Sequence, residues 1–176
     1  MTDRTKADYR FLDTPEVLGR LFHPGRRDSF RNRDSTREDL MIPMGDGVEI
    51  GASFHLCSND APMILFFHGN GEIVSDYDDF ADLYLELGIS FGVVDYRGYG
   101  DSSGTPTVTD MMNDSHRILD FVLELRQRRG WTGPLTIMGR SLGSASALEL
   151  AGSREADFSN LIVESGFAHT GPLLNV

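Results

Sequence analysis

The sequence predicts an α/β fold in which helices cover both faces of a mostly parallel β-sheet. Four short runs of the chain are almost entirely apolar, as is typical of strands that are buried on both faces. Helical patterns separate these runs, and two alternating segments joined by a glycine-rich turn precede them. An antiparallel hairpin followed by alternating strands and helices gives a three-layer αβα architecture with right-handed crossovers.

The first part of the chain differs from the rest. Residues 1–38 are charged and show little periodicity, so we expect a partly irregular lead-in with one short helix near Pro15–Phe22. Residues 39–176 carry the predicted α/β domain. With 176 residues in total, the chain is long enough for one domain with a buried core.

The hairpin is predicted from two segments around Gly45-Asp46-Gly47, namely 39–44 and 48–56. In the second segment, apolar residues alternate with polar or small ones, which indicates a strand with one buried face. We expect the solvent side to carry Glu49, Gly51, Ser53 and His55.

The parallel part of the sheet is predicted at Met63–Phe67, Ile89–Tyr96, Leu135–Met138 and Leu161–Val163. Helices are expected between these strands. One begins at Ser75 as its N-cap and ends at Gly88, with Tyr77, Phe80, Tyr84 and Leu87 on one face. A second ends at Gly130 and aligns Met111, Ile118, Val122 and Leu125, and a third spans about 141–151.

The loops after these strands are where ligands bind in such sheets. After the third apolar run comes Gly139-Arg140-Ser141-Leu142-Gly143, the G-x-S-x-G pattern of a nucleophile elbow. A serine in a strained strand-to-helix bend exposes its hydroxyl, and side chains at the two glycine positions would collide. We therefore expect Ser141 to be a nucleophile and the Leu142 N–H to be an oxyanion donor.

Two further loops complete the pattern. His68-Gly69-Asn70-Gly71 follows the first apolar run, and its backbone should supply the second oxyanion donor, the N–H of Asn70. His68 is expected to prop this loop by hydrogen bonding rather than to act as the general base. The loop 95–104 is glycine-rich but lacks dinucleotide spacing, so Asp95 and Arg97 are expected to be structural ties.

The segments HGNG, DYRGYGDSSG and GRSLGS, in this order and strand context, resemble the α/β-hydrolase superfamily, in its serine esterase, lipase and peptidase-like branches. The resemblance covers about 39–165. It implies an eight-stranded, mostly parallel sheet, hydrolysis through an acyl-enzyme and no cofactor or metal. It also implies Ser141 as nucleophile, with oxyanion N–H groups from Asn70 and Leu142. Ser144 stands where many members have a second glycine, and a small side chain is expected to be tolerated there.

The acid and the histidine of a triad are harder to place. The family puts them after the nucleophile, following late strands, and this chain ends at Val176, soon after the sixth expected strand. We therefore expect a C-terminally truncated domain that lacks the last strands. Within the chain, Glu164 and His169 are the candidate acid and base. Two alternatives stay open: a non-catalytic binding or interaction protein, and a short active esterase that uses His169.

Composition limits the partners. A formal net charge of −11 disfavours nucleic acid, so a small-molecule acyl substrate is expected. No apolar run is long enough to span a membrane, and a charged N-terminus without an apolar signal core favours a cytoplasmic protein. The single Cys57 is expected to be a semi-buried hydrophobe. An uncovered sheet edge would favour self-association.

Overall fold

The computed structural model describes residues 7–26 and 37–167. Within these residues, six strands form one sheet in the order β1-β2-β4-β3-β5-β6. The first two strands and β4 pair antiparallel, whereas β4, β3, β5 and β6 run parallel. The strands are β1 (Arg37–Pro43), β2 (Glu49–His55), β3 (Met63–Phe67), β4 (Ser90–Val94), β5 (Leu135–Arg140) and β6 (Asn160–Glu164).

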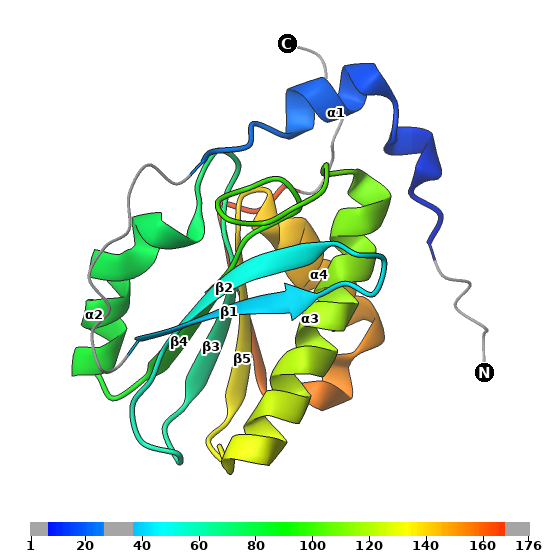
Figure 1. Ribbon diagram of the computed structural model, residues 1–176. Helices are drawn as coiled ribbons and strands as arrows, with labels where there is room; N and C mark the ends of the chain where they lie inside the picture. The colour runs from blue at the N-terminus through cyan, green and yellow to red at the C-terminus, as the bar shows by residue number, and fades with distance from the viewer. Residues whose placement is uncertain (1–6, 27–36, 168–176) are drawn as a thin grey trace, which may run out of the picture.

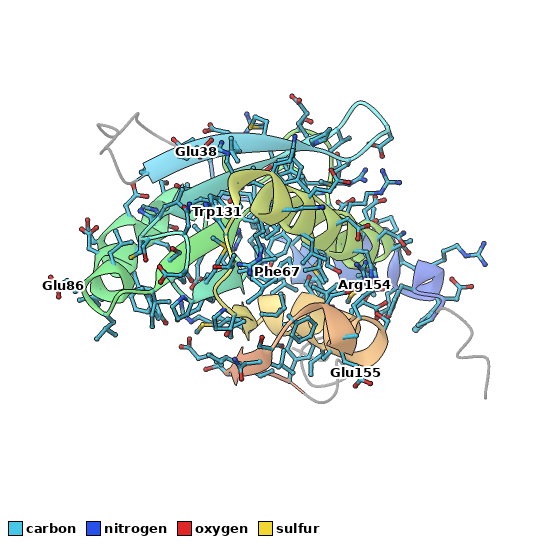
Figure 2. The ribbon with its side chains drawn as sticks, turned by 90° about the horizontal axis from the view of Figure 1, so that it is seen from below. Glu38, Phe67, Glu86, Trp131, Arg154 and Glu155 are labelled. Atoms are coloured by element: carbon cyan, nitrogen blue, oxygen red, sulfur yellow. The ribbon has the colours of Figure 1, made fainter. Side chains whose placement is uncertain are left out.

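Helices lie on both faces of this sheet, which confirms the predicted three-layer α/β class (Figure 1). On one face lies α2 (Asp78–Glu86), preceded by the 3₁₀ turn η2 (Val74–Tyr77). On the other lie α3 (Val108–Arg129) and α4 (Gly143–Ser153). Two buried clusters result, one on each face, and Phe67 lies in the middle of the molecule while Glu38 and Glu86 lie at its rim (Figure 2).

The long helix α3 follows the sequence pattern closely. Its N-cap is Thr107, whose hydroxyl oxygen accepts a 2.9 Å hydrogen bond from the Asp110 N–H. Its buried face includes all four residues expected from the periodicity. The helix ends at Gly130, which adopts φ +69°, a left-handed conformation that favours glycine. Within the described residues, no helix is long and apolar enough to cross a membrane.

The second expected helix differs from its prediction. The chain first makes η2, and α2 begins at Asp78, so Ser75 is not an N-cap. A 3₁₀ turn has about three residues per turn, so residues on either side of it do not share one continuous face. Leu87 lies beyond the last residue of α2, as its C-cap, and is 73% exposed, whereas Ala81 is buried and Tyr84 stacks on Phe91 at 4.8 Å between ring centroids.

The expectation of a solvent-facing side on β2 is wrong. Both Ser53 and His55 are buried. The start of α2 covers this side, where Asp78 accepts a 2.5 Å hydrogen bond from Arg37 and its second oxygen lies 3.9 Å from His55 Nε2. The alternation in the sequence therefore marks a face that is polar but enclosed by charged partners.

The lead-in is anchored to the domain. The helix expected near Pro15 is present as α1 (Pro15–Leu21), after the 3₁₀ turn η1 (Arg10–Leu12). Asp13 Oδ1 accepts hydrogen bonds from the Val108 and Thr109 N–H groups at the start of α3, at 2.8 and 3.2 Å. The chain then runs past the edge where the parallel strands end, which is where the candidate site lies (Figure 1).

Candidate active site

Ser141 occupies the bend between β5 and α4. Its φ of +48° is left-handed, a conformation that costs a non-glycine residue about 1–2 kcal/mol. The residue is exposed, although its neighbours Leu142 and Gly143 are buried. The strained, exposed serine at the start of a helix has the local geometry that the G-x-S-x-G pattern indicates.

Close packing explains both glycines of the elbow, Gly139–Gly143. A Cβ on Gly139 would overlap the carbonyl of Gly143, and a Cβ on Gly143 would overlap the carbonyl of Phe67. The expected collision is therefore present at both positions. It involves the backbone of β3 as well as the bend itself, since Phe67 pairs with Gly139 across the sheet.

Ser144 tightens the same bend. Its hydroxyl donates a 2.6 Å hydrogen bond to the Ser141 carbonyl, and its N–H donates to the same oxygen at 3.0 Å. A serine at this position is therefore accommodated, as expected, and it adds a side-chain bond to the turn.

The oxyanion loop, defined here as His68–Glu72, follows β3 directly beside the elbow. Hydrogen-bonded strands β3 and β5 bring the two segments together at the same edge of the sheet. Within residues 7–26 and 37–167, the hydrogen bonds include none donated by the N–H of Asn70 or of Leu142.

His68 has a structural role. The residue is fully buried, its Nδ1 donates a 2.8 Å hydrogen bond to the Gly69 carbonyl, and its Nε2 lies 3.2 Å from Asp95. Asp95 also accepts a 3.0 Å hydrogen bond from the Val74 N–H. Both ring nitrogens are engaged, so His68 props the loop as predicted.

Arg97 ties the loop after β4 to α3 and to the hairpin. Its guanidinium donates to Asp114 at 2.7 and 2.9 Å and to Asp46 at 3.0 Å. Burial raises the pKa of the Asp114 carboxyl above its usual range, while the hydrogen bonds from Arg97 lower it. The prediction that Asp95 and Arg97 are structural ties is confirmed.

A charged network that the sequence analysis missed links the elbow to the oxyanion loop. Arg140 donates to Glu72 at 2.5 Å, and the other oxygen of Glu72 accepts bonds from the Gly69 N–H at 2.6 Å and the Tyr77 hydroxyl at 2.5 Å. The pKa of Arg140 is raised by its hydrogen bond to Tyr77 and by nearby Glu72. The signal in the sequence is Glu72 directly after HGNG.

Glu164 lies at the end of β6, next to the elbow. Its carbonyl accepts a 2.9 Å hydrogen bond from the Ser141 N–H. Its carboxylate is about half-exposed and lies 3.4 Å from Arg140 Nε. The other candidate, His169, lies outside the described residues.

A cavity of about 350 Å³ opens next to this network, and its lining includes Arg140, Glu164 and the aromatic residues Phe66, Tyr77 and Phe80. Within the described part of the chain, no three His, Cys, Asp or Glu side chains gather in a way that could hold a metal ion. The ends of the neighbouring strands β3 and β5 thus carry the loop with Asn70, the exposed Ser141 and a charged network between them.

The chain belongs to the α/β-hydrolase family described as serine aminopeptidase, S33, whose sequence model matches residues 59–174. Both the elbow and the oxyanion loop lie within the matched residues. The expected superfamily is thereby confirmed.

Similar proteins include lipases. The lysophosphatidylserine lipase ABHD12 of Bos taurus is 35% identical over 118 residues, which is 64% of this chain and 28% of that protein. A monoglyceride lipase structure from Saccharomyces cerevisiae has a TM-score of 0.65 and 22% identity, covering 80% of this chain and 47% of that one. XC6422, an α/β serine hydrolase of Xanthomonas campestris, has a TM-score of 0.58 and 21% identity, covering 76% and 63%.

At 22% and 21% identity, the two solved structures show that this chain shares their fold, and no more than that. The chain spans less than a third of the length of the ABHD12 protein that it matches.

Proposed function

We propose that this chain is a serine hydrolase that cleaves a carboxylic ester through an acyl-enzyme on Ser141. The observation that carries the proposal is the strained Ser141, exposed in the bend before α4 and at the same edge of the sheet as the loop that contains Asn70. Such an arrangement resembles the catalytic centres of acyl-transfer enzymes.

The proposed reaction has two halves. Ser141 Oγ attacks the ester carbonyl carbon while its proton passes to a base, and negative charge develops on the carbonyl oxygen. The N–H groups of Asn70 and Leu142 would donate hydrogen bonds to this oxygen, aided by the N-terminal end of α4. The alcohol then leaves with a proton, and water releases the acyl group as a carboxylic acid in the second half.

A base is essential, since a serine hydroxyl is a weak nucleophile without one. The candidates in this chain are His169 as base and Glu164 as acid. The carboxylate of Glu164 is held by Arg140 at 3.4 Å, so orienting an imidazole would require it to share or leave this ion pair.

The name of a relative supports the proposed substrate class. The lysophosphatidylserine lipase ABHD12, 35% identical to this chain over 118 residues, is named for a substrate that is an ester. A small-molecule ester is therefore the proposed substrate.

The test is hydrolysis of p-nitrophenyl butyrate by the purified, folded chain. We expect a burst of p-nitrophenol followed by slower turnover, and loss of both in Ser141→Ala. His169→Gln and Glu164→Gln then identify the base and acid, because loss of the base should cost at least about 10³-fold in kcat. A folded chain with neither burst nor turnover would contradict the proposal and favour a non-catalytic binding protein.

A further inference from the structure

The lead-in contacts the oxyanion loop. The lead-in is not part of residues 59–174, which the family model matches. The backbone N–H of His23 donates to two acceptors at once, the Tyr99 hydroxyl at 2.9 Å and Asn70 Oδ1 at 3.0 Å. The side chain of the residue that carries the proposed oxyanion donor is therefore bound by a segment more than forty residues before it.

Tyr99 is the centre of this contact. Its side chain is completely buried, and its hydroxyl donates a 2.8 Å hydrogen bond to Asn70 Oδ1. The same hydroxyl accepts a 2.9 Å hydrogen bond from the N–H group of His23. Burial raises the pKa of Tyr99 to about 12, so the hydroxyl stays protonated and remains a donor at neutral pH.

Close packing fixes the segment in place. The Gly25 carbonyl accepts a 2.9 Å hydrogen bond from the Gly100 N–H. A Cβ on Gly25 would lie 3.2 Å from the Gly71 carbonyl oxygen and 3.1 Å from the Ile73 side chain, so the two segments are in tight contact. The hydrogen bonds of Tyr99 thus lie between two closely packed stretches of backbone.

The hydrogen bonds to the Asn70 side chain restrain a loop that is rich in glycine. Asn70 is flanked by Gly69 and Gly71, and Gly71 adopts φ +76°. Glycine permits many backbone conformations, so a loop with this composition does not hold one N–H direction by itself. An oxyanion donor gains its effect from being held in place before the reaction.

We propose that Tyr99 and the backbone of His23 are positioning groups for the oxyanion hole, which hold the side chain of Asn70 and thereby the direction of its N–H. The proposal rests on the proposed function only in taking the Asn70 N–H as an oxyanion donor. It assigns a role in the active site to the lead-in and to a buried tyrosine that does not touch the reacting atoms.

The first experiment measures structure without activity. Amide hydrogen exchange is followed by mass spectrometry in peptides that cover 66–73 and 20–26, for the full chain and its variants. In Tyr99→Phe and Asn70→Ala we expect exchange in both peptides to accelerate about 10-fold or more, because both lose the hydrogen bonds that join them. Asn70→Asp keeps the acceptor and should restore slow exchange.

The matched control is Tyr9→Phe. Tyr9 also lies in the lead-in and its hydroxyl donates to Glu149 at 2.5 Å, away from the oxyanion loop. This variant removes a hydroxyl from the same segment and should leave exchange in 66–73 unchanged. The proposal would be overturned if exchange in 66–73 were unchanged in Tyr99→Phe and Asn70→Ala. It would also be overturned if Tyr9→Phe accelerated this exchange to the same extent.

The second experiment uses p-nitrophenyl butyrate. Complete loss of one oxyanion donor costs about 10²–10³ in kcat, so a misdirected one should cost about 10-fold to 100-fold with KM nearly unchanged. A purely structural defect would instead lower the active fraction in line with thermal unfolding. If the unaltered chain has no Ser141-dependent activity, the proposed function fails, while the exchange experiment still decides whether Tyr99 holds the loop.

Discussion

The N–H of Ser141 donates a 2.9 Å hydrogen bond to the carbonyl of Glu164. This bond extends the pairing of β5 with β6 by one step into the elbow, since Arg140 and Glu164 are register partners. The strained conformation of the serine is thus held by the neighbouring strand as well as by its own turn. Strain at such a site persists only where surrounding structure fixes it.

Glycine at position 143 is expected to be required for both folding and activity. In Gly143→Ala the new Cβ would overlap the Phe67 carbonyl, which cannot move without disturbing β3. We expect a loss of about 3 kcal/mol in the free energy of unfolding, measured by urea denaturation.

The matched control is Gly152→Ala near the end of the same helix, where a Cβ would meet nothing within 4 Å. Alanine should stabilise that position by about 0.5–1 kcal/mol. Equal effects of the two substitutions would contradict the packing explanation of the elbow.

The strain at Ser141 can be measured by comparing two inactive variants. Both Ser141→Ala and Ser141→Gly remove the hydroxyl, but only glycine adopts φ +48° without a steric cost. We expect Ser141→Gly to be more stable than Ser141→Ala by about 1 kcal/mol in urea unfolding. If alanine is as stable as glycine here, the elbow carries no strain.

His55 should make the protein sensitive to mild acid. Burial, followed by the charge of Arg37, lowers the pKa of His55 below its ordinary value of 6.5, although Asp78, Asp82 and Asp39 oppose this shift. Below pH 6.5 the unfolded chain therefore binds a proton that the folded chain does not. The free energy of unfolding consequently falls with decreasing pH, by at most about 1.4 kcal/mol per pH unit.

The measurement is urea unfolding at several pH values between 5 and 8, for the unaltered chain and for His55→Gln. Carboxylates contribute to the pH dependence of unfolding in both proteins. The difference between the two slopes of unfolding free energy against pH therefore gives the contribution of His55. The variant should show a shallower loss of stability below pH 6.5. Parallel slopes would show that His55 is not the cause.

The edge strand β6 is expected to promote self-association. It pairs with β5 on one side, and its side chains Leu161, Ile162 and Val163 are 38–42% exposed. An exposed apolar edge strand is a template for pairing with another chain. Ile162→Lys should lower the sedimentation coefficient at high protein concentration, while the exposed helical Leu148→Lys serves as control. Equal sedimentation of all three proteins, each monomeric, would contradict this expectation.

The sequence predicts most of the fold because a short run of apolar residues indicates a strand that is buried on both faces. Met63–Phe67 is found as a strand with the predicted bounds, and α3 carries the predicted buried face. Burial by polar partners is harder to predict. His55 was expected in solvent because its pattern does not reveal that Arg37 and Asp78 would enclose it.

For the candidate site, the sequence predicts the local geometry of the serine bend but not the contacts that hold it. Geometry within the bend, such as the collision of a Cβ at Gly139 with the carbonyl of Gly143, follows from local sequence, whereas the collision at Gly143 is with Phe67 on β3. The ties that hold it come from distant segments: Glu72 binds Arg140, and His23 binds Asn70. Such contacts depend on how the chain packs in three dimensions. The position of Glu72 directly after HGNG marks it as part of the loop, but spacing along the sequence does not identify its partner, 68 residues away.

The most direct measurement of the central claim is the intact mass of the folded chain after incubation with a fluorophosphonate, with Ser141→Ala beside it. Such a probe reacts with a serine that a base activates. We expect a single adduct on the unaltered chain and none on Ser141→Ala. A folded chain that gains no adduct, or an adduct that persists in Ser141→Ala, would contradict the claim that Ser141 is the nucleophile of an acyl hydrolase.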